Sequence, residues 1–146
     1  MANLFPVFDM PEIISASVEK QKYNPSVYFD FERGDFIRDG AHRIVEADGK
    51  TAYIQWCRKM VETERFTCLA YSTDSGTEMQ DALSKGEHSA VESAIERTIT
   101  EALMINPKTE YVREFQFDWF NADLTVSFVV KGVEYDEQKL RTLVRT

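Results

Sequence analysis

The stretch YVREFQFDWFNADLTVSFVV, residues 111–130, decides the fold. Apolar side chains alternate along both halves of it, and Asn121-Ala122-Asp123 separates the halves. Because successive side chains of a strand point to opposite faces, this pattern predicts a β-hairpin with one apolar face. That face carries Phe115, Phe117, Trp119, Leu124, Val126, Phe128 and Val130. The opposite face is polar enough to meet water or a partner and carries Glu114, Gln116, Asp118, Thr125 and Ser127.

Two segments ahead of the hairpin, residues 50–62 and 89–104, repeat their apolar residues every three or four positions. This spacing predicts two helices that each bury one face. Ser89 and Glu92 have the spacing of a capping box at the start of the second helix. Asn106-Pro107 should end that helix, because the residue before a proline avoids the α conformation.

The remaining segments are shorter. Residues 27–31, 36–38 and 43–47, separated by Gly34 and Asp39-Gly40, predict a small antiparallel meander. Residues 136–144 favour a short C-terminal helix, since Leu140 and Val144 lie one turn apart. The three prolines of residues 1–25 disfavour regular structure there. These residues predict an extended N-terminal arm whose apolar side chains pack on their own domain or on a neighbour.

The order of these elements predicts an α+β fold. A length of 146 residues suits one domain. We therefore expect residues 26–146 to form a single domain, with a mostly antiparallel sheet and two main helices packed on one face. Residues 1–25 form the arm ahead of it.

Composition excludes several classes of partner. A formal net charge of −8 argues against nucleic acid, because phosphate-binding proteins usually show a basic face. It also argues against an anionic membrane surface. No apolar run approaches the ~20 residues that span a bilayer, and the first residues lack the features of a secretory signal. Cys57 and Cys68 are expected to be reduced, buried thiols of a protein made in the cytoplasm, although the sequence leaves a disulfide between them open.

No catalytic, cofactor or metal site is predicted. His42 and His88 have no Cys or His at ligand spacing. Glu64, Asp74 and Glu78 are the candidates for a glycan hydrolase that uses paired carboxylates, but solvated surface acids are the favoured interpretation. The first hypothesis is therefore a structural assembly protein and not an enzyme. A glycan hydrolase and an unrelated binding adaptor are the alternatives.

Several motifs, taken in order, resemble the small baseplate proteins of contractile-tailed phages. They are Phe29-Asp30-Phe31 with Phe36, Gln55-Trp56, Thr63-Glu64-Arg65-Phe66, Gly76 with Glu78, and Asn106-Pro107 ahead of Phe115 and Phe117. Their order and spacing extend over nearly the whole chain. The chain is most similar to the sheath initiator, or tail-lysozyme-like baseplate wedge, family. Within it, the branch found in prophages and phage-like particles of Gram-positive bacteria is the most similar.

The resemblance implies a structural role in the baseplate of a virion or tail-like particle. Six copies would form a ring around the tail tube, in contact with tube or tube-initiator proteins. They would dock on the helical core of the baseplate wedge and offer a sheet to the first sheath subunits. A tail-associated, lysozyme-like hydrolase is the alternative that the family's older label suggests.

The resemblance also implies partner-binding residues. Many members carry Glu-Pro-Arg just after the long helix, and Asn106, Pro107 and Lys108 stand in that place. The acid is absent here, so we expect Glu110 or Glu64 to supply it. Glu64 and Arg65 belong to a segment that we interpret as a docking edge.

A sheath arm is expected to add as a strand at an open sheet edge. Residues 27–31 and residues 124–130 are the candidate edges. In the second candidate, Leu124, Val126 and Phe128 are the predicted contacts.

Overall fold

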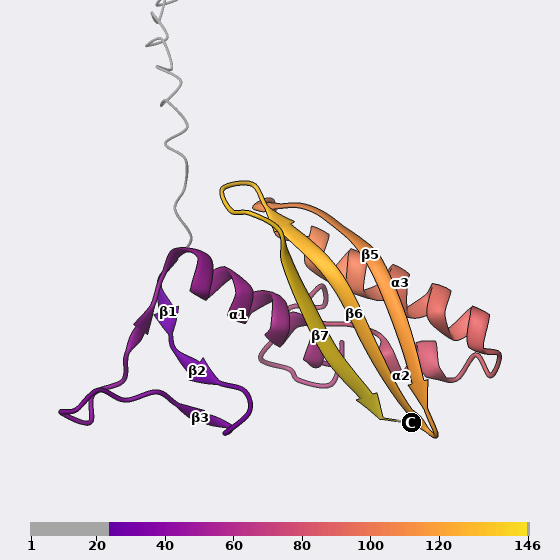
Figure 1. Cartoon of the computed structure of the whole chain (residues 1–146), viewed down its shortest axis with the longest axis horizontal. Coiled ribbons are helices and arrows are strands. Elements are labelled where there is room, and N and C mark those ends of the chain that lie inside the picture. The colour runs from indigo at the N-terminus through magenta and orange to yellow at the C-terminus, as the bar shows by residue number, and fades with distance from the viewer. Residues whose placement is uncertain (1–23, 146) are drawn as a thin grey trace, which may run out of the picture.

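The predicted hairpin is the core of a three-stranded antiparallel sheet in the computed structural model, which describes residues 24–145. Its strands are β5 (Thr109–Phe120), β6 (Asp123–Gly132) and β7 (Gln138–Arg145), in the order β5-β6-β7. The helices α1 (Gly49–Glu62), α2 (Met79–Leu83) and α3 (His88–Met104) lie on one face of this sheet (Figure 1). The α+β prediction, with two main helices and antiparallel pairing, is confirmed. The predicted arm lies outside the described residues except for Asn24 and Pro25.

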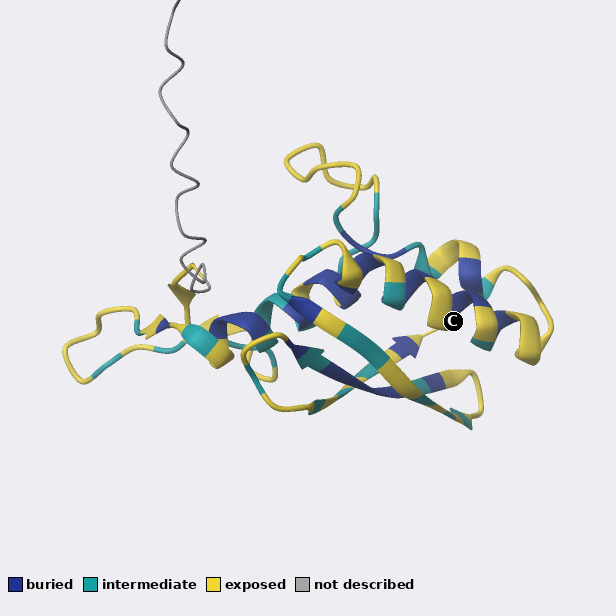
Figure 2. Ribbon diagram, turned by 90° about the horizontal axis from the view of Figure 1, so that it is seen from above, coloured by how far each residue is buried: buried dark blue, intermediate teal, exposed yellow. Residues whose placement is uncertain are grey.

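The core forms where the helices face the sheet. Leu124, Val126, Phe128 and Val130 of β6 are almost fully buried, as the alternation predicts. Buried residues of α1 and α3 meet them across the interface (Figure 2). The prediction that each helix buries one face is therefore confirmed, because the apolar residues that repeat at helical spacing are the buried ones.

The four-residue spacing of Leu140 and Val144 misled the prediction at the C-terminus. Residues 138–145 form strand β7, not a helix, and pair with β6 from Val130↔Gln138 to Asp123↔Arg145. A separation of four residues puts two side chains on the same face of a helix and also on the same face of a strand. Pairing with β6 therefore decides between the two structures.

Two smaller predictions are also wrong. Ser127 is 7% exposed rather than facing water, because it lies in the central strand between Gln116 of β5 and Arg141 of β7. No capping box forms at α3, whose N-cap is Glu87 without a side-chain cap. The prediction that the helix ends before Pro107 is confirmed, since α3 ends at Met104.

The predicted meander is present but separate from the main sheet. It consists of β1 (Ser26–Val27) paired with β4 (Glu46–Ala47), and β2 (Phe29–Asp30) paired with β3 (Asp35–Phe36), both antiparallel. It lies beside the first turns of α1, away from the three-stranded sheet (Figure 1). The meander therefore reaches the rest of the domain mainly through α1.

The two cysteines differ in environment. Cys57 on α1 is buried, as predicted, whereas Cys68 is exposed. The prediction of two buried thiols is wrong for Cys68, because it lies in the loop that leaves the core after α1.

Candidate docking surfaces

The two edge strands of the main sheet, β5 and β7, differ in the regularity of their pairing with β6. In β5, Glu114 has a φ of +59° and the pairing with β6 shifts register between Arg113 and Gln116. Such a bulge disrupts an edge and makes it a poor template for a further strand. Strand β7 pairs with β6 without a register shift, and among the described residues it has no strand on its other side. The regular open edge of this sheet is therefore β7.

Neither of the two predicted edge strands is open. Residues 124–130 lie in β6, which pairs with β5 on one side and β7 on the other. The side chains of Leu124, Val126 and Phe128 are 0%, 0% and 1% exposed and belong to the core of this chain. The sequence identified a strand with strong alternation, but alternation does not distinguish a central strand from an edge.

The other predicted edge, residues 27–31, is closed by a side chain. The Phe29 N–H donates to Gln55 Oε1 at 2.8 Å, and Gln55 Nε2 donates to the Val27 carbonyl at 2.8 Å. The carboxamide of α1 thus occupies the hydrogen-bonding positions that an added strand would use. Sequence reasoning missed this contact, because nothing in the spacing of Gln55 indicates which backbone groups it meets.

A groove of about 870 Å³ lies between the meander and α1. Aromatic rings from both sides line it: Phe29, Phe31, Phe36, Tyr53 and Trp56. Lys59, Asn106 and Lys108 also line the groove. The predicted docking residues Asn106 and Lys108 therefore share one surface with an aromatic cluster that the sequence did not connect to them.

Internal hydrogen bonds fix the turn that carries Asn106 and Lys108. Asn106 Oδ1 accepts from the Lys108 N–H at 3.0 Å, and the Asn106 carbonyl accepts from the Thr109 N–H at 2.9 Å. The Tyr53 hydroxyl donates to Thr109 Oγ1 at 2.9 Å in the interior, which ties the turn to α1. Pro107, between Asn106 and Lys108, is exposed. The turn is thus held in a defined position at the groove before any partner arrives.

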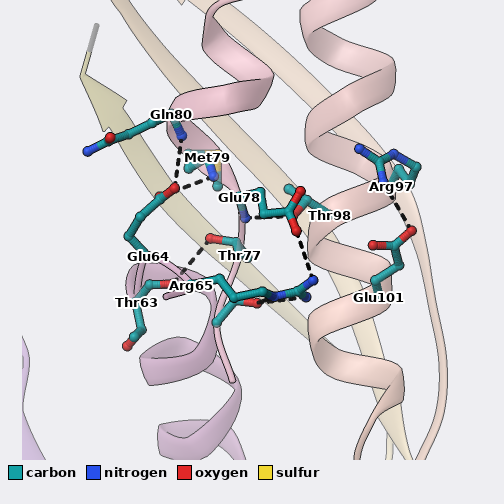
Figure 3. A network of polar contacts seen from close by, with 11 residues as sticks. Thr63, Glu64, Arg65, Thr77, Glu78, Met79, Gln80, Arg97, Thr98 and Glu101 are labelled. Carbon is teal, nitrogen blue, oxygen red and sulfur yellow. Dashed lines mark hydrogen bonds and ion pairs between the residues drawn. The ribbon is translucent and has the colours of Figure 1, made fainter. Parts of the chain in front are cut away.

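Glu64 and Arg65, predicted to form a docking edge, make contacts within the chain (Figure 3). The Glu64 carboxylate accepts from the N–H groups of Met79 and Gln80 at 3.1 and 3.4 Å, at the start of α2. The Arg65 guanidinium donates to the Gly76 carbonyl at 3.1 Å. Together these contacts close the base of the loop between residues 65 and 76.

An ion pair completes this closure. Arg65 Nη1 lies 3.1 Å from Glu78 Oε1, and the Arg65 side chain is only 12% exposed. The Glu78 N–H donates to Thr98 Oγ1 at 2.8 Å, which attaches the loop to α3. The loop itself is exposed and carries Phe66, Leu69 and Tyr71.

The acids proposed for a hydrolase lie away from the aromatic groove. Glu64 and Glu78 are engaged in the contacts just described, and Asp74 lies exposed in the loop. The three line neither the aromatic groove nor the smaller hollow of about 440 Å³ beside Arg58. Among residues 24–145, no cluster of His, Cys, Asp or Glu is placed to hold a metal ion. No helix in this part of the chain is long and apolar enough to cross a membrane.

A regular open strand, an aromatic groove and a rigid turn at that groove are features of a small structural subunit that binds other proteins. Residues 26–135, most of the chain, match the family described as contractile injection system sheath initiator. The chain therefore belongs to the sheath initiator family, whose members are structural parts of contractile injection systems. No curated protein sequence matches the chain significantly.

Proposed function

We propose that this sheath initiator starts sheath growth by accepting an extended arm of a sheath subunit at β7. The observation that supports this most directly is the outer edge of β7, which pairs with no strand of residues 24–145, is eight residues long and is free of bulges. Each added backbone hydrogen bond contributes about 0.5–1.5 kcal/mol net. Several such bonds, repeated around a closed ring, would make a stable nucleus without a large side-chain interface.

The second part of the proposal concerns attachment to the baseplate. The aromatic groove suits the apolar face of a helix from the wedge, since grooves of this kind bind amphipathic helices through a few large side chains. Lys59 and Lys108 would meet acidic residues on that helix. Asn106, Pro107 and Lys108 would then act with the groove rather than alone.

The remaining part concerns the particle. Resemblance to the branch from prophages and phage-like particles of Gram-positive bacteria supports a phage tail or tail-like particle as the location. Six copies in a ring around the tube would each present one β7 edge to a first sheath subunit. Tube or tube-initiator proteins would line the inside of that ring.

Proline substitutions along β7 test strand addition. Along an edge strand, N–H groups point alternately toward the neighbouring strand and away from it. Of Arg141→Pro and Thr142→Pro, one therefore removes an outward N–H and leaves the pairing with β6 intact. Melting curves identify that variant. On baseplates that carry it, we expect the baseplate to assemble and the sheath to fail to polymerise.

The matched control is proline on the outer side of β5, chosen from Gln116→Pro and Phe117→Pro by the same melting criterion. This control should leave sheath growth unchanged, because the bulged β5 is not the proposed template. Normal sheath growth with the folded β7 variant would show that strand addition at β7 is wrong.

The alternative hypothesis, a glycan hydrolase, can be tested directly. We expect purified protein to release no soluble fragments from peptidoglycan and to leave no cleared band in a zymogram. Cleavage that disappears in Glu64→Gln or Asp74→Asn would overturn the structural assignment.

A further inference from the structure

Strand β7 presents a row of basic side chains on the sheet face away from the helices. Lys139, Arg141 and Arg145 are exposed at alternate positions, with Leu143 between the last two, 52% exposed. Leu140 and Val144 point the other way and contact the core. The row is unexpected in a chain with 25 acidic and 17 basic residues.

The two arginines of this row make no ion pair within the described residues. Arg141 lies opposite Ser127 of β6, which carries no charge. Arg145 lies opposite Asp123 in the register, but no ion pair joins either arginine to a carboxylate of residues 24–145. Lys139 Nζ donates to the amide oxygen of Gln116 at 2.9 Å, a neutral partner. Because Gln116 belongs to β5, Lys139 reaches across β6 and away from the open edge. The positive charge of the two arginines is therefore what an incoming strand would meet.

We propose that the β7 edge selects an extended segment that carries carboxylates at every second residue. This inference rests on the proposed strand addition and names the chemistry of the arm that β7 accepts. Side chains directly opposite on paired strands have Cβ atoms about 4.5–5.5 Å apart, so opposite charges there attract. An arginine can bind a carboxylate through two parallel hydrogen bonds, which adds geometric selection.

The core of the domain determines which residues fit on the other face of the incoming segment. Its inward side chains would lie beside Leu140 and Val144, at the end of the layer that α1 covers. Apolar residues at those positions would extend the core by one strand. The segment that fits β7 therefore alternates between acidic and apolar residues. On its acidic face, the position opposite Leu143 can be apolar as well.

The same charges exclude a wrong partner. If two copies of this chain paired through their β7 edges, basic side chains would face each other across the new strand pair. Like charges directly opposite on neighbouring strands are destabilising. The basic side chains therefore disfavour pairing between two β7 edges and favour pairing with an acidic arm. The same charges thus repel the wrong partner and attract the proposed one.

Three capped peptides that span β7 test the proposal with the full chain. They share one apolar face, and on the other face they carry Glu, Gln or Lys at alternate positions. Fluorescence anisotropy should give about tenfold tighter binding for the Glu peptide than for the Gln peptide, and weaker binding still for the Lys peptide. The difference should shrink in about 1 M salt, where the Debye length falls to about 3 Å.

Charge reversal on β7 supplies the second measurement. Arg141→Glu with Arg145→Glu should make the Lys peptide bind more tightly than the Glu peptide. Arg33→Glu with Lys50→Glu makes the same change of net charge at exposed positions on the meander and α1, and should preserve the original order. If the reversed variant does not fold by circular dichroism, Arg141→Gln with Arg145→Gln replaces it and should abolish the preference.

The outcomes separate this proposal from the function on which it rests. Equal binding of the three peptides would overturn the charge preference while leaving strand addition in place. Binding of none of them would overturn both. A preference for acid that survives substitution of both arginines would also overturn the proposal, because the selection would then come from another surface.

Discussion

Gln55 and Phe29 are joined by a hydrogen bond from the Phe29 N–H to Gln55 Oε1 of 2.8 Å, which spans the gap between α1 and the meander. The same carboxamide donates to the carbonyl of Val27, so it holds the chain on both sides of Tyr28. The ring of Phe29 lies 5.2 Å from that of Phe36, and both line the aromatic groove. One side chain on α1 thereby fixes one wall of the proposed docking surface.

Replacement of Gln55 should release the meander without unfolding the domain. Gln55→Ala removes two hydrogen bonds, each contributing about 0.5–1.5 kcal/mol. We expect faster hydrogen exchange at the Phe29 amide and unchanged exchange in β6. Thr51→Ala, at an exposed position of the same helix, is the control. Equal exchange at Phe29 in both variants would show that the carboxamide does not hold the meander.

Gly76 should tolerate no side chain. Its φ is +99°, and a Cβ there would lie 2.5 Å from the carbonyl oxygen of Thr63. Gly86 has a φ of +81° but no atom of the described residues within 4 Å of its Cβ position. Both alanine variants incur backbone strain of about 1–2 kcal/mol. Only Gly76→Ala adds a clash with fixed backbone, so it should lose about 1–3 kcal/mol more in chemical denaturation. Equal losses would mean that the loop base can move aside.

Phe128 should behave as a core residue and not as a contact for a partner. Phe128→Ala removes a side chain that is 1% exposed and should cost about 3–5 kcal/mol of unfolding free energy. Phe120→Ala, where the ring is 76% exposed, should stay within about 0.5 kcal/mol of the wild type. A stable Phe128→Ala protein that fails to bind sheath would contradict this assignment.

The aromatic groove and the turn beside it should act together in wedge capture. Phe36 is 40% exposed, and Lys108 lies at the same groove. Phe36→Ser with Lys108→Glu should weaken binding to purified wedge proteins by about tenfold or more, with a nearly unchanged melting curve. Leu143→Ser, on the β7 edge, is the control and should leave wedge binding intact. A parallel loss of melting temperature and binding would indicate a structural role instead.

The two thiols should differ in reactivity. Burial raises the pKa of Cys57 from 9.0 to about 12, so its thiol stays protonated near neutral pH. A disulfide reagent should therefore label Cys68 alone in the folded protein and both residues after denaturation. Because the raised pKa belongs to the folded state, the stabilisation from Cys57 is fully present below pH 9 and is lost as the pH rises through 12. Rapid labelling in Cys68→Ser would contradict the buried position of Cys57.

The sequence by itself determined the hairpin, the two long helices and the side chains that form the core between them. These elements follow from local periodicity, because a strand repeats every two residues and a helix every 3.6. It also placed Asn106 and Lys108 at a turn after the long helix. Each of these conclusions depends on residues that are close together in the chain.

Only the tertiary structure decided which strand is the open edge and what surrounds the predicted docking residues. Leu140 and Val144 fit a helix or a strand equally well until β6 offers a pairing partner. Gln55 closes an edge formed by residues more than twenty positions away, and Glu64 reaches the start of α2. Such contacts join distant segments. Hydrogen bonds between residues far apart in the chain produce no repeating pattern in the sequence from which they could be predicted. The edge available to a sheath arm therefore follows from the completed fold and not from any one segment of the chain.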